Sequence, residues 1–198
     1  MSNIIFVKQD DPFIQNFMTR FSINSPHCYR IPISSSVTGW FIGKGGENIR
    51  RVQEGFREVF STGDDTRTLF LHLSVKDDFI YVVSSFDHVS RLVAEMLSMY
   101  EIVHEKTLTL TNTGYVLGQK WKNKRYIQNI VCTATMRLNG VLEPFCDVKM
   151  DGDSLIIRST DLTAINVLES YFQWLDTKKV TYTPPSSEDI PNFTDDED

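Results

Sequence analysis

The chain has 198 residues, of which 41% are apolar, and a formal net charge of −6. This length suits one ordinary domain or two small ones with modest cores, and no apolar run reaches the roughly 20 residues that span a bilayer. The start lacks the basic and apolar regions of a signal peptide, and three scattered cysteines, Cys28, Cys132 and Cys146, fit reduced thiols. We therefore expect a cytoplasmic or nuclear protein without membrane contact.

The negative charge is concentrated at the C-terminal end. Residues 180–198 contain six acidic side chains and no Lys or Arg, whereas the rest of the chain has 20 basic and 20 acidic ones. A Pro184-Pro185-Ser186-Ser187 stretch precedes these acids, a composition that predicts a disordered acidic tail. Because the remaining body is neutral, binding of a nucleic acid would depend on a local basic patch rather than on a strong overall field.

Residues 1–25 form an N-terminal extension with a short amphipathic helix. Asp11 and Pro12 suit the N-cap and the first helical position. Apolar side chains then share one helical face at positions Phe13, Ile14, Phe17, Met18 and Phe21. This stripe must be buried, either on the neighbouring domain or against a partner or a second copy of the chain.

The rest of the chain repeats itself with an offset of 75 residues. The segment Gly39–Lys44 recurs as Gly114–Gln119, and the same offset pairs Asn48 with Asn123 and Phe70 with Phe145. Identities and apolar spacing are kept together over most of each unit. We therefore predict two homologous domains, at 26–103 and 104–179.

Both units show one order of predicted elements, β-α-α-β-β-α, which indicates an α+β fold with a three-stranded antiparallel sheet covered on one face by three helices. In the first unit a strand at 28–33 is followed by a helix at 37–42 and by a long helix that carries Ile49, Val52 and Phe56. A hairpin then joins a strand around Leu71 to a strand at 79–83 through a turn at Asp77-Asp78, and the last helix begins at Asp87. In the second unit the elements are a strand at 107–111, a helix at 123–136, hairpin strands at 145–150 and 155–158, and a helix at 161–175.

A glycine-rich loop separates the two helices of the first unit. Ile42, then Gly43-Lys44-Gly45-Gly46, then Ile49 lie between the short helix and the long one. This motif within this element order resembles the eukaryotic type I KH family, over both repeats. Glycines allow close approach of a sugar-phosphate backbone, and the start of the following helix favours phosphate.

The resemblance implies that the first unit binds single-stranded RNA, or single-stranded DNA, in a groove that grips about four nucleotides. The implied site comprises the glycine loop, a neighbouring apolar wall and the second strand as the opposite wall. Its residues are Gly39, Ile42, Gly43, Lys44, Gly45, Gly46, Ile49, Arg50, Arg51, Leu71, His72 and Leu73. Arg50 and Arg51 are equally consistent with a solvated helix face paired with Glu47 and Glu54.

The second unit departs from the family pattern. Its loop is Gly118-Gln119-Lys120-Trp121, with Trp121 in place of the last glycine, and Lys124 replaces the apolar residue equivalent to Ile49. We expect a degenerate KH domain that acts as a scaffold. Its basic patch also suits a non-standard RNA contact or a protein interface, and comprises Lys120, Trp121, Lys122, Lys124 and Arg125.

We expect a non-enzymatic RNA-binding protein that acts in post-transcriptional regulation, without a cofactor or metal ion. Four scattered histidines show no metal-ligand spacing, and no nucleophile signature accompanies the fold. The alternative is a protein-assembly scaffold with incidental RNA binding, in which the second unit or the N-terminal helix contacts a partner or a second copy. A further hypothesis is that the acidic tail competes with RNA for the Lys120–Arg125 patch.

Overall fold

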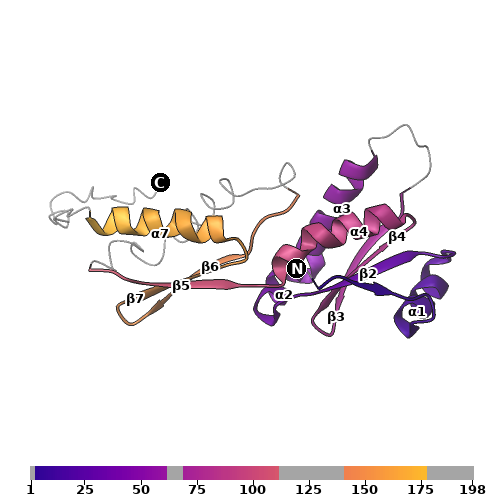
Figure 1. The fold of residues 1–198 in the computed structure, drawn as a ribbon, viewed down its shortest axis with the longest axis horizontal. Coiled ribbons are helices and arrows are strands. Elements are labelled where there is room, and N and C mark those ends of the chain that lie inside the picture. The colour runs from indigo at the N-terminus through magenta and orange to yellow at the C-terminus, as the bar shows by residue number, and fades with distance from the viewer. Residues whose placement is uncertain (1–2, 62–68, 112–140, 178–198) are drawn as a thin grey trace, which may run out of the picture.

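The computed structural model of the protein describes residues 3–61, 69–111 and 141–177. Within these ranges, five α-helices and two antiparallel sheets make an α+β fold, in which two units lie side by side (Figure 1). This architecture is compatible with a KH-like fold. No helix in the described ranges combines the length and apolar character needed to cross a bilayer.

The first sheet has four strands in the order β1-β2-β4-β3, all antiparallel to their neighbours. Hairpin strands β3 and β4 meet at Asp77 and Asp78, whose φ angles of 51° and 60° are both left-handed, as in a type I′ turn. The turn predicted at this position is therefore confirmed. The four strands are β1 (Ile5–Val7), β2 (His27–Pro32), β3 (Leu71–Lys76) and β4 (Phe79–Ser84).

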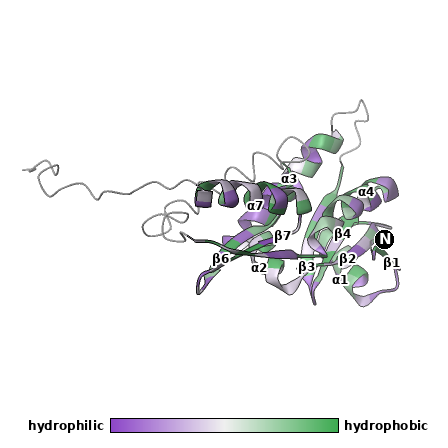
Figure 2. Ribbon diagram, turned by 60° about the vertical axis from the view of Figure 1, so that its left-hand side comes forward, coloured by the Kyte–Doolittle hydropathy of each residue, from purple (hydrophilic) through white to green (hydrophobic). Residues whose placement is uncertain are grey.

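Three helices pack on one face of this sheet and enclose the main core of the first unit. They are α2 (Ser35–Ile42), α3 (Glu47–Ser61) and α4 (Asp87–Leu97). Along β4, Ile80 and Val82 point into this core, because successive side chains of a strand alternate between its faces. In Figure 2, apolar and polar colours alternate along the strands and helices, as expected for elements with one buried face.

The N-terminal helix α1 (Pro12–Phe21) covers the opposite face of the same sheet (Figure 1). Its N-cap is the predicted one, since the Asp11 carboxylate accepts a hydrogen bond of 2.8 Å from the N–H of Phe13. Its fully buried Ile14 and nearly buried Phe17 form a second cluster with Tyr81 and Val83. The apolar stripe thus packs on the chain's own sheet.

The expectation of a three-stranded sheet covered on one face was wrong for this unit. Strand β1 adds a fourth strand beside β2, and α1 covers the second face. A three-residue strand is too short to show an alternating pattern, so the sequence carried no signal for it. The N-terminal extension is therefore built into the first sheet.

The second unit has a sheet with the strand order β5-β7-β6, and helix α7 packs on it (Figure 1). In each sheet the last strand along the chain pairs with two neighbours: β4 lies between β2 and β3, and β7 lies between β5 and β6. Strands β6 and β7 begin 75 residues after β3 and β4. The first strand starts at His104, earlier than predicted. These elements are β5 (His104–Thr109), β6 (Cys146–Asp151), β7 (Ser154–Ser159) and α7 (Leu162–Thr177); the helix predicted at 123–136 lies outside the described residues.

Residues 141–145, just before β6, join the second unit to the core of the first. Leu142 and Phe145 are buried in the first core, and the Phe145 ring lies edge-on to Trp40 with centroids 5.7 Å apart. The buried Tyr100 hydroxyl donates a 2.7 Å hydrogen bond to the carbonyl of Glu143, whose carboxylate is 2.9 Å from Nη1 of Arg51. Apolar packing and polar contacts together hold the units against each other.

This contact predicts an unusual response at Gly55 of α3. Ala is a better helix former than Gly by about 1 kcal/mol, but a Cβ at Gly55 would lie 2.8 Å from a methyl group of Val141. We expect Gly55→Ala to lower the free energy of unfolding by about 1–2 kcal/mol, because overpacking outweighs propensity. Urea denaturation measures this difference.

The matched control is the double variant Gly55→Ala with Val141→Ala, which removes the colliding methyl groups. Its stability should recover to near that of the parent chain, so that the two changes are strongly non-additive. A Gly55→Ala chain that is more stable than the parent would show that residues 141–145 do not pack on α3.

Candidate nucleic-acid interface

The loop Gly43–Gly46 joins α2 to α3 in a conformation that favours glycine. Gly43, Gly45 and Gly46 have φ angles of 73°, 61° and 79°, in the region that L side chains rarely adopt. A Cβ at Gly43 would also lie 2.8 Å from the Asn48 side chain and 2.9 Å from its backbone nitrogen. Lys44 and Gly45 are exposed at the tip of the loop, which leaves peptide groups and one cation open to a ligand.

Asn48 holds this loop in place. Its side-chain amide donates a 2.7 Å hydrogen bond to the carbonyl of Trp40, near the end of α2. The bond ties the first turn of α3 to the preceding helix across the loop. The position 75 residues later is also asparagine, Asn123, which lies outside the described residues.

The two arginines after the loop have different environments. A Cβ at Gly46 would lie 3.6 Å from Nη1 of Arg50, so the exposed Arg50 guanidinium is beside the loop. Arg51 instead forms the ion pair with Glu143 between the units. Neighbouring residues on a helix point about 100° apart, and this rotation separates a loop-side arginine from an arginine that joins the two units.

Gln53 and Arg57 lie on the same side of α3 as Arg50, and they cover the outer edge of β3. The Gln53 side-chain oxygen accepts a 2.9 Å bond from the N–H of Leu73, and the Arg57 guanidinium donates bonds of 3.1 and 2.7 Å to the Leu71 carbonyl. Because β3 is the last strand of its sheet, these backbone groups face away from β4. We refer to Gly43–Gly46, Arg50, Gln53 and Arg57 as the loop surface.

The structure brings together only part of the residue set expected from sequence. Gly39, Ile42, the loop, Ile49 and Arg50 are all at least partly accessible. The side chains of Leu71 and Leu73 lie in the core, with 0% and 3% of their surface exposed. His72 points to the opposite face of the sheet, where its ring is 5.2 Å from that of Phe17. The patch at Lys120, Trp121, Lys122, Lys124 and Arg125 lies outside the described residues.

Gln53 and Arg57 were missing from the sequence-based set. They follow Arg50 by three and seven residues, which places all three on one helical face. That spacing was visible in the sequence. Their contact with the edge of β3 was not, because it joins residues up to 20 positions apart through the folded sheet.

Burial shifts the pKa values of the Cys28 and His72 side chains in the first unit. Burial, with help from Asp11, raises the pKa of the Cys28 thiol to about 12, so this thiol is protonated and unreactive at neutral pH. Burial lowers the pKa of His72, and the nearby Arg57 and Arg20 lower it further. The described residues include no group of three His, Cys, Asp or Glu side chains placed to hold a metal ion.

Comparisons with known proteins leave the family open. No family model matches the chain, and no curated protein matches it. Among solved structures, a chain from the crystal structure of an a/eIF2alpha-aDim2p-rRNA complex from Pyrococcus horikoshii OT3 is matched at 11% identity, over 82% of this chain and 92% of that one. The TM-score is 0.30, and a likeness at that level carries no argument about this chain.

The loop geometry predicts that Asn48→Asp destabilises the first unit. The substitution replaces an amide that donates to the Trp40 carbonyl with a carboxylate that faces it. Loss of the bond and the unpaired charge should cost about 1–3 kcal/mol at neutral pH. Urea denaturation at a series of pH values measures the cost.

The pH dependence separates this explanation from a general packing defect. The introduced carboxyl should have a raised pKa in the folded state, so its penalty is fully present above that pKa and shrinks as pH falls and the group is protonated. Asn48→Ala, which cannot titrate, is the control and should show a constant deficit relative to the parent. Equal deficits for both variants at all pH values would contradict the hydrogen bond's assigned role.

Proposed function

We propose that the first unit binds single-stranded RNA through the loop surface, in the manner of a type I KH domain. The observation that carries this proposal is the loop itself. Three left-handed glycines, an exposed Lys44 and the adjacent Arg50 stand at the start of the 15-residue helix α3. Such a loop lets a phosphate approach backbone N–H groups closely and adds two mobile cations beside them.

Bases beside the clamped backbone would meet an apolar surface and two polar side chains. Ile42 and Ile49 are partly exposed next to the loop, and a Cβ at Gly39 would meet no atom within 4 Å, so this side is open. Gln53 and Arg57 already use the edge groups of Leu73 and Leu71. We therefore propose that base edges are contacted by Gln53 and Arg57 themselves, or by the strand after these two side chains move aside.

The proposal extends to the whole chain. We propose a non-enzymatic RNA-binding protein of the cytoplasm or nucleus, acting in post-transcriptional regulation, with a second KH-like unit that serves mainly as a scaffold. The strand order shared by the two sheets supports the duplication. Each single groove holds few nucleotides, so useful affinity would come from several contacts acting together.

The test reverses the charge of the loop without disturbing the core. Lys44→Asp with Gly45→Asp adds two carboxylates at exposed positions, and a Cβ at Gly45 meets no atom within 4 Å. The φ angle of 61° at Gly45 is one that Asp tolerates, as Asp78 does at 60°. We expect affinity for a random single-stranded RNA pool to fall by about tenfold or more, with an unchanged circular dichroism spectrum.

Lys149→Asp with Gly152→Asp is the matched control, because it makes the same charge change at an exposed strand position and at a glycine with φ of 58°. This variant should lose much less affinity, since it lies on the hairpin of the second unit. Undiminished RNA binding by a folded Lys44→Asp/Gly45→Asp chain would reject the loop as the binding site and leave the scaffold interpretation.

A further inference from the structure

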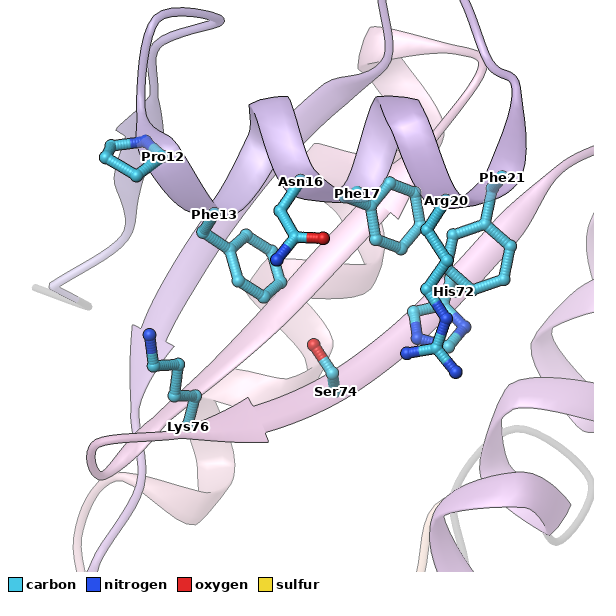
Figure 3. A pocket seen from close by; sticks show the side chains of 9 residues that line it. All are labelled: Pro12, Phe13, Asn16, Phe17, Arg20, Phe21, His72, Ser74 and Lys76. Atoms are coloured by element: carbon cyan, nitrogen blue, oxygen red, sulfur yellow. The ribbon is translucent and has the colours of Figure 1, made fainter.

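A second groove lies on the other face of the first sheet, between α1 and β3. It has a volume of about 340 Å³ and is open to solvent. Figure 3 shows side chains of α1 facing those of β3 across this space. Its lining residues are Pro12, Phe13, Asn16, Phe17, Arg20, Phe21, His72, Ser74 and Lys76. We call it the α1 groove.

One end of the α1 groove is aromatic. The His72 ring lies 5.2 Å from that of Phe17 and 5.3 Å from that of Phe21, measured between centroids. The Arg20 guanidinium lies 5.3 Å from the Phe21 ring centroid, and 38% of the Phe21 surface is exposed. Accessible rings with a guanidinium beside them are the kind of surface on which unpaired bases stack.

The lining of the α1 groove is cationic in a chain whose body is neutral. Arg20 and Lys76 stand at opposite ends of it in Figure 3, and none of its nine lining residues has a carboxylate. The Lys76 ammonium is 3.9 Å from the Asp77 carboxylate, but both side chains are more than half exposed, so this pair is weak. The groove therefore suits an anionic ligand better than a neutral or basic one.

The α1 groove and the loop surface adjoin the same strand from its two faces. Arg57 contacts the outer edge of β3 from α3, and Arg20 lies over β3 from α1. Both cations act on His72, whose pKa they help to lower. Since β3 ends the sheet, no further strand blocks a path around it within the described residues. A flexible single-stranded polynucleotide that leaves the loop surface can pass Arg57 and enter the α1 groove.

We propose that the α1 groove is a second contact for single-stranded RNA, which takes nucleotides beyond those held at the Gly43–Gly46 loop. The inference rests on the proposed function, because it assigns the continuation of the same ligand. Phosphates pair with Arg20 and Lys76, and a base stacks on the Phe21 and His72 rings. His72 thus contacts RNA from the α1 face, away from the loop.

The test compares two RNA lengths on the full chain. Oligouridylates of about four nucleotides, the number a Gly-x-x-Gly loop clamps, fill only the loop surface, whereas those of about twelve also reach the groove. Arg20→Glu with Lys76→Glu should weaken binding of the longer RNA by about tenfold and leave the shorter one nearly unchanged. Phe21→Leu, which keeps an apolar side chain but removes the ring, should weaken only the longer RNA by about fivefold.

Arg91→Glu with Lys149→Glu is the matched control, since it reverses two exposed cations on α4 and β6, outside both surfaces. The inference is wrong if the groove variant binds the longer RNA as this control does, or if it loses affinity for both lengths equally. Lys44→Asp/Gly45→Asp separates the two proposals. If that variant binds the short RNA normally, the proposed function fails and the groove proposal falls with it.

Discussion

The burial of Val52 and Phe56 against the first sheet sets the rotation of α3, and the rest of the interface depends on that rotation. Both side chains lie in the core, with 4% and 0% of their surface exposed. With this stripe fixed, Arg50, Gln53 and Arg57 must face the edge of β3, and Arg51 and Gly55 must face residues 141–145. One helix therefore serves three contacts at once, and a substitution on one flank leaves the others in place.

The edge of β3 explains why α3 carries long polar side chains on its loop side. An unpaired strand edge is a site for unwanted pairing with another chain. Gln53 and Arg57 satisfy the Leu73 N–H and the Leu71 carbonyl, and so protect the edge in the absence of a ligand. The same side chains are well placed to exchange these bonds for bonds to a base. Protection of the sheet and recognition of RNA would then use one set of residues.

Much of the fold of the first unit was predictable because it depends on local signals. The Asp11 cap and the Asp77-Asp78 turn each specify nearby structure, and the described elements agree. Strand β1 was not predictable, because three residues cannot show a period. Leu71 and Leu73 were expected at the binding surface because the family resemblance placed this strand there, although their alternation with His72 and Ser74 favours a buried leucine side.

Arg50 and Arg51 have different environments, and the environment of Arg51 includes a long-range contact. The partner of Arg51 is Glu143, which is 92 positions away and lies in the second unit. Local sequence supports either arginine equally, since both precede the core residue Val52 on the same helix. The packing of residues 141–145 on α3 pairs Arg51 with Glu143, whereas Arg50 remains beside the loop. The second unit thus shapes the site of the first through its contact with α3.

The most direct measurement is an NMR titration of the isotopically labelled full chain with a single-stranded RNA oligonucleotide. The account predicts that backbone signals of Gly43–Gly46 and side-chain N–H signals of Arg50, Gln53 and Arg57 shift together. The side-chain signal of Arg51, on the other flank of the same helix, should stay in place. Shifts at Arg51 without shifts at the loop, or shifts confined to α7 and its sheet, would contradict the assignment of the loop surface as the RNA-binding site.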